Sequence, residues 1–537
     1  MKKILVISIL IILGTSCEKV LDKNPLDQLS DTDIWNNSTM VQLFLNNLYN
    51  AFEVDPESFW ETLSDNAESA NTGFTHNIQQ TNFDKSYDAG WSYSDIRKAN
   101  LVIANVSTST TISEEDKDNL IGQAKFFRGY AYFNMILKFG GVVLVNEPLS
   151  PDSELKLARS NLADSWTFVI NDFKDAALRL KNNVSEKARL TKGAALLMEA
   201  RAELFAGKFE EAKMTSESLL TLGYDLQPLY NDLFNKLNIY KSSPEVILAV
   251  EYKFNVKENW IIKYQTPMAQ DASILGWCNA NPSQQLVDEY LIIDDDGVAR
   301  KWDESNQYNA FKNSGNVLQA MYRKREPRFY ATIAPDSTVF WEIAFRYNVG
   351  GNHSYWRTWN EVGALTATTC KTGYTPAKYM INDLAYKPAS GSDVHWIQFR
   401  YAEVILNYAE ALLRLNLLDE ARTQINKIRV RGGLPALSTN INLWNIYESE
   451  RRKELAFEGT RYWDLLRWRK FDGVSIIPEL NVKINCMKIS NDLTHYEIIP
   501  LTEARSDRHW EARRYLFPIP YKEILQNPNL VQNPGWE

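Results

Sequence analysis

The sequence predicts a mostly α-helical fold, in which tetratricopeptide-like pairs of helices form a scaffold and a long irregular segment forms a ligand face. Three observations lead to this prediction. Apolar residues recur at helical spacing in a series of segments before residue 223 and again over 397–470. A pattern of small residues that turns and restarts as a second helix occurs near Leu197 and recurs near Leu406. The intervening segment, 224–396, is rich in Gly, Asn, Ser, Thr and aromatic residues and has few helical patterns.

The N-terminus, residues 1–16, has the pattern of a lipoprotein signal peptide. Two lysines precede an apolar run, Ile4–Leu13, which is too short to span a bilayer as a helix but fits the apolar region of such a peptide. Small residues then lead into Cys17, as they do where signal peptidase II cuts and the cysteine is acylated. We therefore expect Cys17 to carry a lipid anchor and residues 17–40 to form a tether. An ordinary signal peptide with a chance cysteine is the alternative.

The fold is expected to begin at residue 41 and to form one domain that extends to residue 537. Amphipathic patterns predict helices in its N-terminal part, 41–223, over 41–52, 91–106, 123–139, 161–180 and 192–222. The irregular segment, 224–396, then leaves this scaffold as a long excursion. Long irregular segments held by a rigid scaffold are where binding usually resides, so we expect the ligand face there.

Residues 397–470 are expected to contain a helical hairpin followed by a third helix, and 471–537 to form a C-terminal segment. The apolar stripe of the hairpin runs through Ala402, Leu406, Ala409 and Leu413 in its first helix and Leu418, Ala421, Ile425 and Ile428 in its second. The alanines allow two antiparallel helices to approach closely. Gly432 and Gly433 end the second helix.

The third helix of this region, predicted over 443–470, carries charges of mixed sign on one face. These charges are Arg451, Glu454, Glu458 and Arg461, at positions i, i+3, i+7 and i+10. Neighbouring Trp and Leu residues leave little room for a solvated side, which is the alternative interpretation. We therefore predict a partly buried ion-pair network with a structural role. Gly459 inside the helix costs about 1 kcal/mol relative to Ala, which indicates close packing against it.

The run from Glu450 to Trp468 closely resembles the signature of the SusD/RagB family. Further segments that resemble the family in the same order are Leu21–Pro25, Ala124–Phe133, Asn281–Tyr290, Arg325–Ile333, Tyr515–Pro520 and Asn527–Trp536. Members of this family are surface lipoproteins of Bacteroidetes that deliver nutrients, usually glycans, to a SusC-like TonB-dependent transporter. The resemblance thus implies non-catalytic glycan capture at the cell surface with such a transporter as partner. Peptide capture, as in RagB-like members, and a surface glycoside hydrolase are the alternatives.

Composition and motifs bear on the remaining classes of function. The net charge is -8 and there is no basic run, which argues against nucleic-acid binding. The five His residues lie in no metal-binding or catalytic spacing, and no nucleophile elbow or phosphate-binding glycine loop is present. Asp294–Gly297 resembles part of a calcium loop but lacks the downstream ligands, so a polar turn is the preferred interpretation. We therefore expect no catalytic residues, no metal and no cofactor. With 67 acidic residues, some pair of carboxylates will have the spacing of a glycoside hydrolase by chance, so composition does not decide this alternative.

Candidate ligand contacts are aromatic residues outside the segments that resemble the family, because indole and phenol rings offer amphipathic contact surface to sugars. The aromatic candidates are Phe74, Trp260, Trp277, Trp341, Tyr355, Trp356 and Trp359, and Asn77, close to Phe74 in the sequence, is added to them. Trp277, which directly precedes the segment that begins at Asn281, is the strongest single candidate. The resemblance itself assigns none of them, since SusD-like proteins place their ligand contacts in variable segments.

Three cysteines remain after Cys17, and their spacing fits no metal site. Cys278, Cys370 and Cys486 form either one disulfide with one free thiol or three buried thiols, and the sequence leaves both arrangements open.

Overall fold

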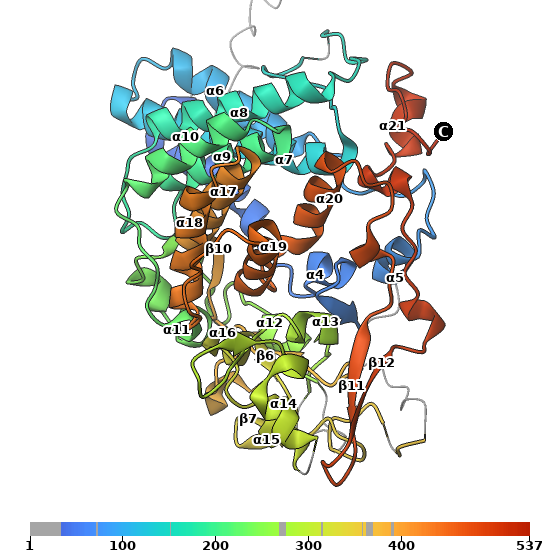
Figure 1. The fold of residues 1–537 in the computed structure, drawn as a ribbon. Helices are drawn as coiled ribbons and strands as arrows, with labels where there is room; N and C mark the ends of the chain where they lie inside the picture. Colours follow the sequence, from blue (N-terminus) through green and yellow to red (C-terminus); the bar gives the residue numbers. More distant parts are fainter. Residues whose placement is uncertain are drawn as a thin grey trace, which may run out of the picture.

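The computed structural model describes residues 34–70, 74–150, 152–267, 275–312, 315–356, 358–360, 369–387 and 391–537. The predicted signal peptide, Cys17 and most of the tether lie outside these residues. The described chain is mostly helical, as predicted, with short strands in its second half (Figure 1). No helix within it combines the length and the apolar character needed to cross a membrane.

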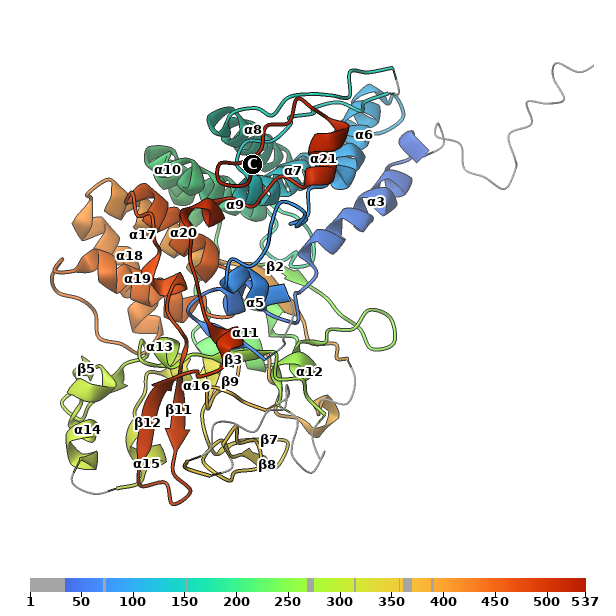
Figure 2. The same ribbon diagram turned by 90° about the vertical axis from the view of Figure 1, so that its right-hand side faces the viewer.

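The N-terminal part is built mainly from long helices that pack side by side, whereas α4 and α5 lie nearer the middle of the molecule (Figures 1 and 2). Its elements are α3 (Ser38–Asn46), η1 (Asn47–Phe52), α4 (Phe59–Leu63), β1 (Ala67–Ser69), α5 (Phe74–Gln79), α6 (Ser94–Thr108), α7 (Glu114–Phe139), α8 (Leu162–Arg179), α9 (Lys192–Ala206) and α10 (Phe209–Leu220). All five predicted segments are helical, and 192–222 forms the two helices α9 and α10. Helix α7 begins nine residues earlier than predicted, because the Ser113 side chain caps it and three acidic residues occupy its first turn.

The predicted hairpin forms from α17 (Tyr401–Arg414) and α18 (Leu418–Arg431), and it packs directly on the earlier hairpin α9–α10. Leu204, Ala212 and Ala411 share a small buried cluster where the two hairpins meet, so small side chains allow the close approach. The repeat observed in the sequence thus corresponds to two stacked helical hairpins. Together with α6–α8 they surround the largest apolar core of the molecule.

The irregular segment forms the end of the molecule opposite the long helices (Figure 1). Its helices and helical turns are α11 (Tyr230–Asn235), η2 (Ile239–Lys241), α12 (Ile261–Gln265), α13 (Gln284–Val287), η3 (Trp302–Glu304), α14 (Asn306–Phe311), α15 (Val317–Met321), α16 (Pro327–Thr332) and η4 (Leu384–Tyr386). Its strands are β2 (Val246–Val250), β3 (Ala280–Pro282), β4 (Ile292–Ile293), β5 (Ala299–Arg300), β6 (Ile333–Ala334), β7 (Thr338–Phe340), β8 (Ile343–Phe345), β9 (Thr375–Pro376) and β10 (Trp396–Arg400). It has apolar clusters of its own, separate from the helical core.

Strands of the described chain pair two by two and antiparallel, as β1–β3, β2–β10, β4–β5, β6–β9, β7–β8 and β11–β12. The first of these pairs ties the irregular segment to the N-terminal part, since Ala67 faces Pro282 and Ser69 faces Ala280. The hairpin of β11 (Asn485–Ile489) and β12 (Tyr496–Pro500) extends from the C-terminal segment into the irregular end (Figure 1). The remaining C-terminal elements are η5 (Pro478–Leu480), η6 (Ala504–Ser506), η7 (Ala512–Tyr515) and α21 (Tyr521–Gln526), the last of which lies beside the long helices (Figure 2).

The prediction of one helix over 443–470 is wrong. Helix α19 (Leu443–Glu454) and helix α20 (Arg461–Phe471) are separated by a turn. Phe457 and Gly459 in this turn have φ angles of 62° and 75°, which end regular helix geometry. A Cβ atom at Gly459 would meet nothing within 4 Å, so the backbone angle, rather than close packing, explains this glycine.

Candidate functional site

A cluster of three aromatic rings and one lysine lies on and beside α12. It consists of Trp260, Lys263, Tyr264 and Trp277, and we call it the α12 platform. Trp260 and Trp277 are 38% and 43% exposed. The ring centroids of Tyr264 and Trp277 are 4.6 Å apart at an angle of 56°, so the two rings form an uneven surface rather than a parallel stack. The platform presents broad apolar faces to solvent.

Backbone contacts fix Trp277 against α12. Its N–H donates to the Lys263 carbonyl at 2.8 Å, and the next two amides donate to carbonyls of Thr266 and Tyr264. This approach requires a glycine at 276, since a Cβ atom there would lie 1.9 Å from the Thr266 carbonyl oxygen. The Gly-Trp pair in the sequence is therefore a structural unit that holds the indole at the surface.

All 16 tryptophans of the chain lie in residues that the structure describes, and only Trp260 and Trp277 are exposed. Protein folding places most indole surface in the core, because each ring carries a large apolar area. Two exposed indoles that share one neighbouring lysine therefore form a distinct surface feature. An exposed aromatic patch of this kind marks a binding site more often than an isolated exposed residue does.

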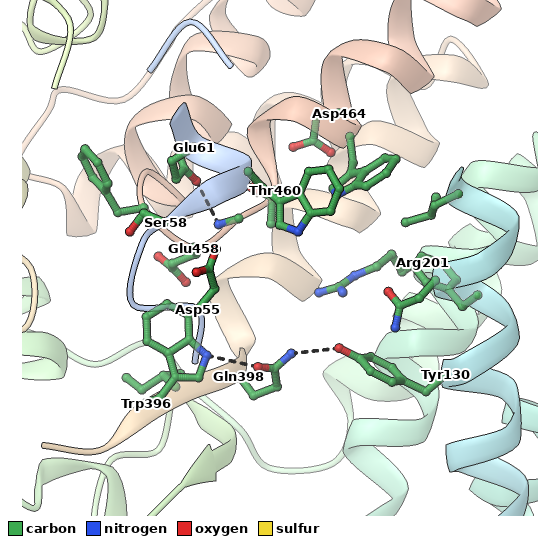
Figure 3. A pocket seen from close by; sticks show the side chains of 18 of the residues that line it. Asp55, Ser58, Glu61, Tyr130, Arg201, Trp396, Gln398, Glu458, Thr460 and Asp464 are labelled. Carbon is green, nitrogen blue, oxygen red and sulfur yellow. Dashed lines mark hydrogen bonds between the residues drawn. The ribbon is translucent and has the colours of Figure 1, made fainter. Parts of the chain in front are cut away.

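A cleft adjoins the platform, and we call it the central cleft (Figure 3). Gln265 of α12 donates to the Ser58 hydroxyl at 3.3 Å, and Ser58 is one of the residues that line the cleft. Burial raises the pKa of Tyr264, and the charges of Glu57 and Asp55 raise it further; Asp55 also lines the cleft. The platform and the cleft are thus neighbouring parts of one surface region.

The central cleft has a volume of about 320 Å³ and lies between the N-terminal helices and the segment from β10 to α20. Its walls combine aromatic rings with polar and charged side chains. The rings of Trp60 and Trp463 are 4.6 Å apart, and Trp396 packs at 5.0 Å from Tyr379. This volume is at the lower end of the range of small-molecule sites.

Polar groups in the central cleft bind one another. Trp396 donates its indole N–H to Gln398 at 3.1 Å, and Gln398 donates to the Tyr130 hydroxyl at 3.4 Å (Figure 3). Glu61 is buried and accepts from the Gly459 amide at 2.8 Å and from the Asn66 side chain. Burial raises its pKa. These contacts use Glu61 to hold the fold, so this carboxylate is not available to a ligand in the cleft.

The four charges predicted as a network on one helix face are ion-paired, but not with one another. Glu454 binds Arg400 at 2.6 Å and Arg328 at 3.3 Å, and it also binds Arg431. The three other predicted members have partners on further elements: Arg451 with Asp464, Glu458 with Arg400 and Lys378, and Arg461 with Asp65. The prediction of a shared face is wrong because the helix breaks after Glu454.

Burial and charge act in opposite directions on these carboxylates. Burial alone would raise the pKa of Glu454, but the charges of Arg431, Arg400 and Arg328 outweigh this effect and hold the pKa below its ordinary value. The side chains of Glu454 and Arg400 are almost completely buried. This network is a structural element in the interior.

Three of the predicted ligand contacts are buried, and for them the prediction is wrong. Trp341 is 2% exposed and donates its indole N–H to the Ile381 carbonyl at 2.9 Å. Tyr355 donates to Glu503 at 2.7 Å, and its ring packs edge-on against Trp356 at 4.9 Å. Each ring fills an apolar cluster of the irregular segment, where its polar atom or its face already has a partner.

The remaining predicted contacts either lie away from the platform or fall outside the residues that the structure describes. Trp359 is partly buried under Lys488 and borders a separate hollow with Asn491 and Asp492. Asn77 is exposed in α5 beside another hollow, which includes no platform residue. The side chain of Phe74 lies outside the described residues. The structure thus brings together Trp260 and Trp277 and leaves the other candidates whose side chains it describes apart from them.

Sequence reasoning missed Lys263 and Tyr264 on the platform and the tryptophans of the central cleft. Trp260, Lys263 and Tyr264 stand at i, i+3 and i+4, which is the spacing of one helix face, and this signal was available in the sequence. The cleft residues come from segments far apart in the chain. No local pattern predicts that Trp60 and Trp463 meet.

The cysteine alternatives are decided by the structure. Cys278, Cys370 and Cys486 are three buried thiols, and none of them forms a disulfide. Asp294 and Asp296, in the segment predicted as a polar turn, pair with Arg300 across the β4–β5 hairpin. Among the described residues, no group of His, Cys, Asp and Glu is arranged to hold a metal ion.

Stacked helical hairpins, an irregular face and an exposed aromatic platform define a scaffold protein that binds ligands. The comparison with known families agrees with this class. The model of the SusD family matches residues 244–536, which is more than half of the chain, and a second model, described as starch-binding and associating with the outer membrane, matches 19–204. The chain belongs to the SusD family.

Individual relatives extend the likeness over the whole chain. A SusD-like protein of Bacteroides ovatus is 25% identical, with 99% of this chain and 97% of that protein covered. The crystal structure of a SusD-like protein from Bacteroides fragilis has a TM-score of 0.78 at 27% identity and covers 96% of this chain and all of that one. A SusD-like carbohydrate-binding protein of Bacteroides fragilis has a TM-score of 0.74 at 23% identity over 93% of this chain and all of that one.

Proposed function

We propose that the chain is a cell-surface lipoprotein that captures an oligosaccharide on the α12 platform and delivers it to a SusC-like TonB-dependent transporter. Family models described by starch binding and by association with the outer membrane support this proposal, as does the carbohydrate-binding structural neighbour. A family described by binding also favours a binding protein over an enzyme. The ligand is expected to leave the protein chemically unchanged.

The observation that carries the proposal is the exposure of Trp260 and Trp277 while the other tryptophans of the chain are partly or fully covered. The apolar C–H face of a sugar ring stacks on an indole, which gains dispersion energy and removes apolar area from water. The other tryptophans among the 16 of the chain are partly or fully covered and already pack in the interior. The two exposed indoles are therefore not explained by core packing. Their exposure beside α12 is therefore best explained by a ligand.

Energy magnitudes favour stacking over hydroxyl hydrogen bonds as the main source of affinity. Each sugar hydroxyl exchanges hydrogen bonds with water for hydrogen bonds with the protein, and the net gain is only about 0.5–1.5 kcal/mol. Burial of half an indole, which has an area of roughly 150–250 Å², gains on the order of 2–3 kcal/mol at about 25 cal/mol/Å². Association itself costs several kcal/mol, so we expect weak binding overall.

The direct test is calorimetric titration of the Trp277→Ala variant with the glycan that the wild type binds, identified on a glycan array. We expect affinity to fall about 10- to 100-fold, in line with the loss of one stacking face, while the thermal midpoint moves little. Val339, which is 52% exposed on β7, provides a control substitution away from the platform. Unchanged affinity in Trp277→Ala would remove the platform from the site, and release of shorter sugars by the wild type would exclude a purely binding role.

The anchoring part of the proposal depends on Cys17, which lies outside the described residues. Cys17→Ala should abolish incorporation of a labelled fatty acid, whereas substitution of Ser16 by Ala, another small residue, should preserve it. Incorporation that survives Cys17→Ala contradicts the lipoprotein assignment.

Partnership with a transporter is tested by gentle detergent extraction of cells at native expression levels. We expect a large β-barrel protein to be recovered with this chain in several detergents. Recovery of the chain alone in every detergent would contradict delivery to a barrel.

A further inference from the structure

Lys263 lies between the two exposed indoles of the α12 platform. Its Nζ atom is 5.1 Å from the ring centroid of Trp260 and 5.4 Å from that of Trp277. The faces of indole rings carry partial negative charge and attract the ammonium group, while the aliphatic stem of the lysine packs along the rings. The positive charge is therefore held beside the surfaces on which a sugar would stack.

The ammonium group of Lys263 forms no ion pair with any carboxylate of the described residues. Lysines elsewhere in the same end of the molecule are paired: Lys378 binds Glu458 at 2.7 Å, and Lys257, on a nearby turn, lies 3.5 Å from Glu53. An ammonium group has three hydrogen-bond donors. Lys263 thus retains donors and charge that the fold does not use.

Two acidic residues, Glu57 and Asp55, act on Tyr264 of the platform. The charges of Glu57 and Asp55 raise the pKa of Tyr264 in addition to the effect of burial, and Asp55 also lines the central cleft. The platform therefore has a cationic part at Lys263 and a more negative part at Tyr264. A ligand with a charged group would bind in one orientation, with an anionic group toward Lys263.

We propose that the captured glycan is acidic and that Lys263 receives its uronate carboxylate or sulfate ester while a neighbouring sugar ring stacks on Trp277 or Trp260. This inference rests on the proposed glycan-binding function. An anionic oxygen adds charge–charge attraction to its hydrogen bond with the ammonium group, and a neutral hydroxyl lacks this attraction, so the lysine selects an anion over a hydroxyl. Lys263 is thus a specificity-determining residue of the platform.

The ligand class is tested on an array that carries uronate-containing, sulfated and neutral oligosaccharides, with each acidic glycan beside its methyl-esterified or desulfated form. We expect binding to acidic glycans and loss of binding to their neutralised partners. The uronate and sulfate members of the array distinguish the two sources of negative charge. Equal binding of neutralised forms would overturn the inference and leave the proposed function intact, whereas absence of binding to any glycan would count against the proposed function itself.

The role of Lys263 is tested by titration of charge variants with the acidic glycan that the array identifies. Lys263→Gln should weaken binding about fivefold and remove its dependence on salt, because an exposed ionic contact is modest and screened. Lys263→Arg should retain the affinity within about twofold, since the charge remains. Glu57→Gln should tighten binding, because it removes a nearby repulsive charge.

Lys257→Gln serves as the matched control, since it removes a positive charge from an adjacent turn without altering the platform. The inference is overturned when Lys263→Gln and Lys257→Gln leave affinity equally unchanged while Trp277→Ala abolishes binding. It is also overturned when Glu57→Gln weakens binding and Lys263→Gln strengthens it, which would indicate a cationic ligand. Thermal midpoints of all four variants identify any effect that arises from unfolding.

Discussion

The ion-pair network around Glu454 and the α12 platform both place cations against aromatic rings, but they differ in what surrounds each cation. Arg400 lies 5.7 Å from the Phe234 ring and is bound by Glu454 and Glu458 in the interior. Lys263 lies at similar distances from two indoles at the surface, without a carboxylate partner among the described residues. The same contact thus fixes the fold where the charge is paired and buried, and remains available to a ligand where it is not.

The largest effect is expected from Glu454→Ala in the buried network. The variant leaves the guanidinium groups of Arg328, Arg400 and Arg431 without a carboxylate that all three contact. Loss of one partner of a buried ion pair typically costs about 3–5 kcal/mol, and we expect the upper end here. Urea denaturation measures the free energy of unfolding.

The control for this variant is an exposed ion pair, Glu115 with Lys181, on the surface of the N-terminal helices. Glu115→Ala should move the urea midpoint far less than Glu454→Ala, because the pair is exposed. The contrast also depends on pH. The pKa of Glu454 lies below its ordinary value of 4.5, so the stability from its ionised form is present above that value and is lost in acid. Similar destabilisation in both variants would contradict the distinction between buried and exposed pairs.

A second comparison uses two tryptophans of the irregular segment. Trp341→Ala should cost about 3–5 kcal/mol of unfolding free energy, because its ring is buried and its removal leaves a cavity. Trp277→Ala should cost much less, because its ring is 43% exposed. Melting curves and ligand titration should therefore rank the two variants in opposite order. Trp341→Ala should mainly lower stability, and Trp277→Ala should mainly weaken binding. A large loss of stability in Trp277→Ala would assign it to the core.

The difference between these two residues shows what the sequence can and cannot predict. The helices of the scaffold follow from local periodicity, as at Ala402 and Leu406, because every turn of an amphipathic helix repeats the signal. Trp341 and Trp277 lie in the same irregular segment and have no comparable pattern around them. Their opposite burial depends on packing against distant segments, so local sequence could not separate them.

The turn between α19 and α20 illustrates a second limit. The charges at Arg451 and Glu454 continue in spacing to Glu458 and Arg461, so periodicity predicted an unbroken helix. The break depends on backbone angles at Phe457 and Gly459, which the pattern of charges does not encode. Periodicity therefore identified the charged residues of the network but assigned the wrong partners to them.

An intermediate effect is expected from Glu203, a buried acid in the scaffold that lacks the ion pairs of Glu454. Burial raises its pKa to about 8, and the charge of Glu199 contributes to the rise. The folded protein holds a proton that the unfolded carboxyl, with its ordinary value of 4.5, releases. The native state therefore binds more protons between these values, and the free energy of unfolding falls as the pH rises through them.

Glu203→Gln removes this titration while it keeps the shape of the side chain. At pH 9 the variant should be more stable than the wild type by on the order of 2 kcal/mol, because it avoids a buried charge. At pH 5 the two should differ little. Urea unfolding at both pH values measures the effect, and Glu210→Gln on the exposed surface of α10 is the control. A variant that is less stable than the wild type at pH 9 would show that the carboxylate is needed there.

The smallest effect is expected from substitution of a glycine. The turn between α19 and α20 and the α12 platform each contain a glycine, and the two are required for different reasons. Gly459, between α19 and α20, has a φ angle of 75° and open space around the position of a Cβ atom. Gly276, beside Trp277, has no such space, since a Cβ atom would lie 1.9 Å from the Thr266 carbonyl oxygen. We therefore expect substitution to cost conformational energy at Gly459 and to displace the platform at Gly276.

Gly459→Ala should lower the free energy of unfolding by about 1 kcal/mol, the cost of a left-handed backbone for a residue with a Cβ atom. Gly459→Asn should cost less than Gly459→Ala, because Asn adopts this conformation more readily although its side chain is larger. Both variants should bind the glycan as the wild type does, whereas Gly276→Ala should lose binding. The decisive measurement is the order of the two Gly459 variants in urea unfolding. A larger loss for Asn than for Ala would show that space, and not the backbone angle, makes glycine necessary at this turn.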